Sequence, residues 1–139
     1  MSDDDRPLVS VIIPLFNAQK YIEDCVKCLR NQTLDLFEAI LVDDYSTDAS
    51  FKILERTTRD DDRFTLASNN GPKGVSSARN KGIELARGKY LYFLDVDDQL
   101  QAHALGQIKG VNLGHGLVCT TYFKKYNNLV DLFFEQYKK

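Results

Sequence analysis

Four short apolar runs alternate with three stretches of helical spacing over most of this 139-residue chain. The apolar runs span 8–13, 37–42, 64–67 and 90–94, and helical spacing covers 18–30, a stretch carrying Phe51, Ile53 and Leu54, and 75–87. Strands and helices in strict alternation form parallel sheets, because each helix carries the chain back to the same end. The sequence therefore predicts a single α/β domain with a mostly parallel, Rossmann-like sheet and helices on both faces.

The run 90–94 is the most informative strand, because three carboxylates follow it directly. Its five residues are all aromatic or aliphatic, as in a central strand that is buried on both faces. Asp95, Asp97 and Asp98 come next and would lie at the carboxyl edge of the sheet, where open α/β folds bind ligands. Clustered carboxylates repel one another unless a cation offsets their charge, and oxygen ligands favour Mg²⁺ or Mn²⁺. A plain polar turn is the alternative.

Two other predicted strands deliver polar or aromatic side chains to the same edge. Asp43 and Asp44 follow 37–42, and Pro14, Phe16 and Asn17 follow 8–13. An aromatic ring can stack on a flat base, and carboxylates can accept hydrogen bonds from a base or ribose. No glycine-rich phosphate loop follows the first strand, so phosphate neutralisation would fall to a metal ion. These residues predict a site for a nucleoside diphosphate compound.

Local signals define the predicted helices. Asn17 is the expected N-cap of the first helix, and Pro14 is expected to end the strand before it. The third helix carries small residues at Ala78, Gly82 and Ala86, a spacing that lets a helix lie close to a sheet. Cys25 and Cys28 fall inside the first helix without a second pair of zinc ligands, so core thiols are expected.

Composition describes a soluble globular protein, with 43% hydrophobic and 27% charged residues. The net charge of −2 argues against a nucleic-acid partner, because no basic stripe is visible. Residues 1–7 are polar and acidic, which predicts a disordered leader rather than a signal peptide. A cytoplasmic location is expected.

The sequence after Asp98 is compatible with a helix over 100–108. It predicts a strand over 117–123 and an amphipathic helix over 126–137. The last helix would present Tyr126, Leu129, Val130, Phe133, Phe134 and Tyr137 on one face. Docking on the sheet is the favoured interpretation. A homodimer contact or a peripheral membrane contact through 126–137 stays open.

Four segments together resemble the family 2 inverting glycosyltransferases of GT-A fold. The segments are 9–17 (VSVIIPLFN), 41–48 (LVDDYSTD), Gly74 with 78–80 (ARN), and 88–98 (GKYLYFLDVDD). They occur in the family order over roughly residues 8–100. The resemblance implies a nucleotide-sugar-binding domain over 8–100 and a divergent segment over 101–139. It also implies transfer of a sugar, with inversion, from a nucleotide-diphosphate sugar to an unknown saccharide or lipid-linked acceptor. The first expectation for the donor is a UDP-sugar.

The resemblance also implies roles for individual residues. Phe16 would border the base, with Pro14 and Asn17 beside it. Asp44, alone or together with Asp43, would accept the hydrogen bond of a uracil-type imide. Gly74 and Arg79 would belong to the segment that closes over the nucleotide. Asp95 would touch the ribose and a metal, and Asp97, with Asp98 as a second candidate, would bind Mn²⁺ or Mg²⁺. Asp43 or Asp44 could instead cap the following helix, and Phe16 could belong to the core.

The resemblance fails after Asp98, where relatives continue into an acceptor-binding half that supplies the general base. Only Asp131 and Glu135 are acidic in 99–139, both on the predicted final helix, so no general base is identifiable. A donor-binding half without its acceptor half is the expectation.

Two interpretations from other classes stay open. One is a non-catalytic module that binds a nucleotide or a partner. The other is a phospho-receiver domain, in which Asp43 and Asp44 begin the acidic site and Thr120, Thr121 and Lys124 act as switch residues. A complete strand–helix unit before Asp43 argues against the receiver domain.

Overall fold

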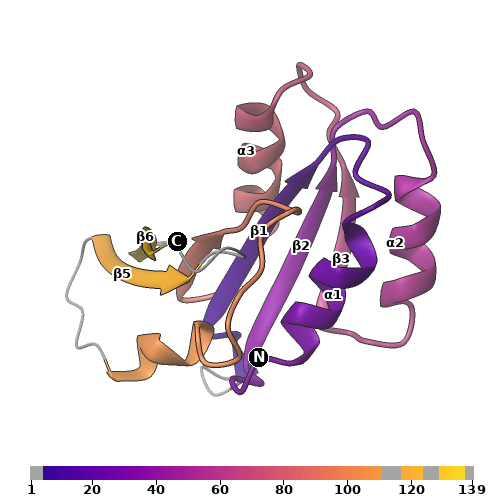
Figure 1. Cartoon of the computed structure of the whole chain (residues 1–139). Helices are drawn as coiled ribbons and strands as arrows, with labels where there is room; N and C mark the ends of the chain where they lie inside the picture. The colour runs from indigo at the N-terminus through magenta and orange to yellow at the C-terminus, as the bar shows by residue number, and fades with distance from the viewer. Residues whose placement is uncertain (1–4, 111–116, 124–128, 137–139) are drawn as a thin grey trace.

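The computed structural model describes residues 5–110, 117–123 and 129–136. This part of the chain forms one six-stranded sheet in the order β3-β2-β1-β4-β6-β5 (Figure 1). The strands are β1 Val9–Leu15, β2 Phe37–Asp43, β3 Phe64–Ser68, β4 Tyr90–Phe93, β5 Leu117–Phe123 and β6 Leu129–Gln136. Strands β1 to β4 are mutually parallel, whereas β6 runs antiparallel to both β4 and β5. The predicted, mostly parallel α/β sheet is confirmed.

Helices cover both faces of this sheet. They are α1 Ile22–Arg30, α2 Ser50–Thr58 and α3 Val75–Leu85, followed by the 3₁₀ helix η2 Leu105–Gly110. Side chains of successive residues in β1 point to opposite faces of the sheet, as strand geometry requires. Val11 and Ile13 pack in the core with α1, α2 and η2, and Ile12 packs in the core under α3. In Figure 1 the arrowheads of β1, β2 and β3 point to the same end, so their carboxyl ends share one edge.

Strand β1 continues through Pro14 to Leu15, so the prediction that Pro14 ends the strand is wrong. Leu15 O accepts from Asp44 N on the β2 side, and Ile12 O accepts from Leu94 N on the β4 side. Amide and carbonyl directions alternate along a strand, so the nitrogen of Pro14 faces the β4 side. The register of β1 with β4 ends at Ile12 and Phe93, so no ladder bond is lost there.

Helix α1 begins at Ile22 with Tyr21 as its N-cap residue, so the predicted N-cap role of Asn17 is wrong. Asn17 instead connects two loops, because its Oδ1 accepts from Thr47 N at 2.7 Å and from Asp48 N at 3.3 Å. A short amide side chain satisfies amides of a neighbouring loop as readily as those of a helix end. The sequence pattern alone does not distinguish these two uses.

Close backbone packing explains two glycines near α3. A Cβ on Gly82 would lie 2.5 Å from Ile12 Cγ2, so the predicted close approach of the helix to the sheet is confirmed. Gly88, in the turn before β4, lies against β1, and a Cβ there would be 2.6 Å from Ser10 N. The α3 helix itself ends at Leu85, two residues before the predicted end, because Ala86 turns extended.

The carboxyl-terminal part differs from the prediction. The strand predicted over 117–123 is confirmed as β5, but Leu129–Gln136 is strand β6, so the amphipathic helix over 126–137 is wrong within that range. Residues 124–128 and 137–139 lie outside the described residues. In place of a helix over 100–108, only η2 forms. Leucine, valine and phenylalanine dominate 129–134, and such a run suits a strand as well as a helix. Pairing with both β4 and β5 decides in favour of the strand.

The predicted leader and the predicted core thiols can also be compared with the structure. Of the predicted leader, residues 1–4 lie outside the described part, but Pro7 is buried and its carbonyl accepts from Lys89 N. Cys25 is a core thiol as predicted, and its burial raises its pKa to about 12. Cys28 is half-buried, and its Sγ lies within hydrogen-bond distance of Leu100 N and O.

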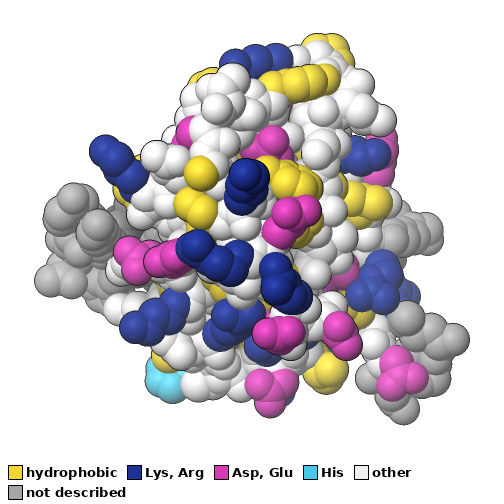
Figure 2. Space-filling view, turned by 90° about the vertical axis from the view of Figure 1, so that its right-hand side faces the viewer, with side chains coloured by type: hydrophobic (Ala, Val, Ile, Leu, Met, Phe, Trp, Pro, Cys, Tyr) yellow, Lys and Arg dark blue, Asp and Glu magenta, His cyan; other side chains and the backbone are white. Residues whose placement is uncertain are grey.

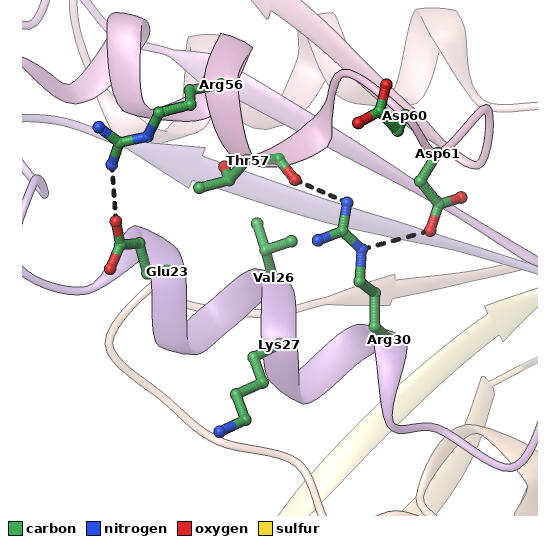
Figure 3. A pocket seen from close by; sticks show the side chains of 8 residues that line it. All are labelled: Glu23, Val26, Lys27, Arg30, Arg56, Thr57, Asp60 and Asp61. Atoms are coloured by element: carbon green, nitrogen blue, oxygen red, sulfur yellow. Dashed lines mark hydrogen bonds and ion pairs between the residues drawn. The ribbon is translucent and has the colours of Figure 1, made fainter.

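The α1–α2 face carries charges of both signs. Figure 2 shows Lys and Arg side chains interspersed with Asp and Glu over this face. A hollow of about 550 Å³ lies between the two helices, and Figure 3 shows that Arg56 and Arg30 in it are already paired. Arg56 pairs with Glu23 at 2.7 Å, and Arg30 donates to Thr57 O at 2.6 Å and pairs with Asp61. Within the described residues, no helix is long and apolar enough to cross a membrane.

Candidate functional site

Four loops meet at the carboxyl edge of the parallel strands. They follow β1, β2, β3 and β4, and they contain all the residues that the sequence predicted for the site except Pro14, Asp43 and Arg79. Pro14 and Asp43 are buried in β1 and β2, and Arg79 lies on α3. The contacts that join these loops show which residues hold the site together and which are left for a ligand.

Asp44 fixes the loop after β3. Its carboxylate is 6% exposed and accepts from Gly74 N at 3.0 Å and from Asn69 Nδ2 at 2.9 Å. Asn69 Nδ2 also donates to Pro72 O, so this loop is tied at both ends. Gly74 has φ of +147°, a value that disfavours any residue with a Cβ. Both carboxylate oxygens of Asp44 therefore accept hydrogen bonds from this loop.

Asp43 is bonded differently, although it is the neighbouring residue. Its Oδ2 accepts from Ser46 N at 3.3 Å, and its side chain is buried, with the residue 8% exposed. Among the described residues, Asp43 Oδ1 has no hydrogen-bond partner. Buried carboxylate oxygens are almost always satisfied, so this open one at the carboxyl edge of the sheet is a candidate acceptor for a ligand. At the start of α2 it is Asp48 that accepts hydrogen bonds, from Ser50 N and Oγ to its Oδ1. Hydrogen bonds from Ser50 lower the pKa of Asp48.

Left-handed backbone occurs at two non-glycine residues of these loops. Asn17 has φ of 45° and Tyr45 has φ of 62°. The conformation is unfavourable for a bulky residue and costs on the order of 1 kcal/mol. The Tyr45 hydroxyl donates to Gly71 O at 2.6 Å, which binds the loop after β2 to the loop after β3. Tertiary bonds therefore hold a strained turn in place beside Asp43.

The loop after β4 carries the acidic cluster. One carboxylate oxygen from each of Asp95, Asp97 and Asp98 lies within 4.8 Å of the other two. Arg79, on the second turn of α3, places Nη2 3.6 Å from Asp95 Oδ1. Its Nε is buried and has no hydrogen-bond partner in the described part of the chain. The structure thus brings Arg79 to the acids, whereas its predicted place beside a nucleotide stays a prediction.

These three carboxylates fit a divalent cation. Mg²⁺ takes oxygen ligands at about 2.0–2.1 Å in an octahedral shell, in which opposite ligands are about 4 Å apart. Separations of up to 4.8 Å therefore need only small side-chain rotations to close around an ion. Asp95 and Asp97 are exposed, so water and substrate phosphate could complete the shell.

Phe16 lies at the surface of the carboxyl edge rather than in the core, with 45% of its surface exposed. Lys73 Nζ lies 3.7 Å from the centroid of its ring. Lys73, Asn69 and Tyr45 also take part in the contacts between these loops, although the sequence did not predict them as site residues. Asn69 had a usable signal, because it is a polar residue directly after a strand that ends at this edge. Lys73 and Tyr45 had none, since their roles depend on how the loops fold back.

Comparisons with known proteins agree with this geometry. The model of the family described as "Glycosyl transferase family 2" matches residues 10–131. The putative glycosyltransferase EpsH of Bacillus subtilis is 41% identical over 97 residues, which cover 70% of this chain and 28% of that protein. The chain therefore spans less than a third of this relative's length.

Solved structures give the same result. The crystal structure of S. aureus TarS 1-349 in complex with UDP aligns with a TM-score of 0.67 and 30% identity, over 73% of this chain and 30% of that one. A mannosyltransferase from Pyrobaculum calidifontis, PcManGT, in complex with GDP-Man and Mn²⁺, aligns with a TM-score of 0.69 and 25% identity, over 81% of this chain and 34% of that one.

The sheet order, the acids at its carboxyl edge and these matches agree with one another. The fold is GT-A-like, as the resemblance implied, and the receiver-domain interpretation is excluded. Since the family model covers most of its length, the chain belongs to glycosyl transferase family 2.

Proposed function

We propose that this chain is the donor-binding part of an inverting, metal-dependent glycosyltransferase that uses a UDP-sugar. The observation that carries the proposal is the buried Oδ1 of Asp43, which has no partner in the described part of the chain and lies at the same edge as the acidic cluster. A uracil imide supplies the N–H that this oxygen lacks, and the exposed ring of Phe16 supplies a stacking surface. The TarS structures with UDP and UDP-GlcNAc support this choice of donor.

Most of the predicted acidic residues take a role in this proposal. Asp43, rather than Asp44, accepts from the base, because the carboxylate of Asp44 already holds the loop at Gly74. Asp95, Asp97 and Asp98 hold Mn²⁺ or Mg²⁺, and the neighbour that contains GDP-Man and Mn²⁺ supports a metal. When bound, the ion would stabilise the negative charge of the departing diphosphate.

Arg79 would respond to the same ligand. Its ion pair with Asp95 is partly exposed, and its Nε is unpartnered within the described residues. A cation at the acids would take over the charge of Asp95 and leave the Arg79 guanidinium available to a phosphate oxygen. The acceptor hydroxyl would attack the anomeric carbon from the face opposite the diphosphate, and no described residue is assigned as its general base.

Calorimetric titration of UDP into the full chain, with and without Mn²⁺, tests the proposal. We expect binding that requires the metal and that is lost in Asp97→Asn, whereas Glu55→Gln, an exposed carboxylate on α2, binds like the wild type. Equal UDP affinity for Asp97→Asn and wild type would contradict the metal assignment. Absence of UDP binding in both conditions would contradict the donor site and favour a module that binds a partner instead.

A further inference from the structure

One face of the Phe16 ring is covered by a cation. Lys73 Nζ lies 3.7 Å from the Phe16 ring centroid, well within the range of a cation–π contact. A base that stacks on this face must displace the ammonium group. This contact joins the loop after β1 to the loop after β3, across the mouth of the candidate site.

The backbone on both sides of Lys73 is fixed, whereas its side chain is exposed. Pro72 O accepts from Asn69 Nδ2 at 3.0 Å, and Gly74 N donates to Asp44. Only the side-chain torsions of Lys73 therefore need to change for Nζ to move. A lysine side chain of four methylene groups can carry its ammonium several ångströms from a fixed Cα without disturbing the loop.

Within the described part of the chain, Lys73 contacts the Phe16 ring and forms no ion pair within 4.0 Å. The same edge carries five carboxylates, Asp43, Asp44, Asp95, Asp97 and Asp98. A cation–π contact at an exposed site is weak, whereas an ammonium–phosphate hydrogen bond is among the stronger polar contacts. A diphosphate therefore attracts Lys73 more strongly than the ring does.

We propose that Lys73 covers the base-stacking face of Phe16 in the free protein and transfers to the diphosphate when a nucleotide binds. The exchange makes Lys73 a specificity-determining residue, because it opposes binding of a base without phosphates and favours binding of a base with them. This inference rests on the proposed function and adds to it a selection for the diphosphate form of the ligand.

Titration of uridine and of UDP, both with Mn²⁺, into wild type and Lys73→Ala tests the exchange. In Lys73→Ala we expect UDP to bind about tenfold more weakly and uridine to bind equally or up to about threefold more tightly. Lys73→Arg should retain the preference for UDP. Lys89→Met is the matched control, because Lys89 also lies over a ring, that of Tyr90 at 5.5 Å, but at the opposite edge of the sheet.

The outcomes separate this inference from the proposed function. If wild type binds UDP and Lys73→Ala binds it equally well, the exchange is wrong and the donor site stands. Equal losses for uridine and UDP would also overturn the exchange, because they indicate that Lys73 only shapes the loop. Absence of UDP binding in wild type overturns both.

Discussion

Strand β2 carries a buried carboxylate at each end, and the protein satisfies one of them but not the other. Glu38, at the amino edge, is 2% exposed and accepts from Ser10 Oγ and Arg87 N, both at 2.6 Å. Its other oxygen pairs with the Arg87 guanidinium at 3.2 Å. Among the residues that the structure describes, Asp43 at the carboxyl edge accepts only a 3.3 Å bond from Ser46 N, and its Oδ1 has no partner.

The difference separates stability from binding within one strand. A buried carboxylate with all its acceptors used contributes to the fold, because its partners would be left unsatisfied without it. A buried carboxylate with an open acceptor costs stability until a donor arrives. We therefore expect changes at Glu38 to affect stability and changes at Asp43 to affect ligand binding, and four predictions follow from this comparison.

The largest effect is expected at the satisfied end. Glu38→Ala should lower the free energy of unfolding by about 3 kcal/mol, because Ser10 Oγ and Arg87 N lose a buried acceptor. Chemical denaturation at neutral pH measures this change. A loss below about 1 kcal/mol would show that the amino edge does not depend on this carboxylate.

The turn that supplies Arg87 should be the next most sensitive feature of this edge. Gly88→Ala would place a Cβ 2.6 Å from Ser10 N, and backbone cannot retreat, so we expect a loss of about 2 kcal/mol. In the control Gly106→Ala the nearest atom is Thr33 Oγ1 at 3.5 Å, an ordinary contact that predicts a change below about 0.5 kcal/mol. Similar melting temperatures for the two variants would contradict the close approach.

The unsatisfied end should respond in binding rather than in stability. Asp43→Asn should leave stability within about 0.5 kcal/mol of wild type and weaken UDP about tenfold, equal to about 1.4 kcal/mol. Wild type should prefer UDP over CDP, because the cytosine ring presents an acceptor where uracil presents an N–H. The amide of the variant can donate, so the preference for UDP should narrow or reverse. An unchanged UDP-to-CDP ratio would remove Asp43 from the base site.

A half-buried carboxylate on the surface gives the smallest effect and completes the comparison. Asp61 accepts from Arg63 and Arg30, and mainly the hydrogen bond from Arg63 lowers its pKa from 3.8 to about 2. A lowered folded-state pKa contributes stability above about pH 4, and this contribution disappears as the pH falls toward 2. Asp61→Asn should cost about 1 kcal/mol at pH 7, after allowance for solvent screening, and nothing at pH 2. A pH-independent difference between variant and wild type would exclude the ion pair as its cause.

The sequence predicted the parallel part of the fold because each of its strands is a short apolar run between turn residues. It failed at 129–136, where Leu129, Val130 and Phe133 fit a helical stripe and a strand equally well. Pairing with β4 decides between them, and that is a long-range contact no local pattern contains.

The candidate site shows the same division. The acids at 95–98 were predictable because they directly follow an apolar strand. The different bonding of Asp43 and Asp44 was not, because it depends on how the loop after β3 returns to Gly74. The contact between Lys73 and Phe16 joins residues that no spacing rule relates.

The position of β1 between β2 and β4 has a consequence for the order of folding. Val9 pairs with Phe37 on one side and with Tyr90, 81 positions along the chain, on the other. As the chain leaves the ribosome, β1, β2 and β3 can assemble early, while the second edge of β1 waits for a much later strand. An unpaired apolar edge of this kind can associate with other chains until it is covered. Strand β4 covers this edge of β1, and Asp95 follows β4 closely in the sequence. The acids of the proposed metal site are therefore synthesised only when the centre of the sheet can close.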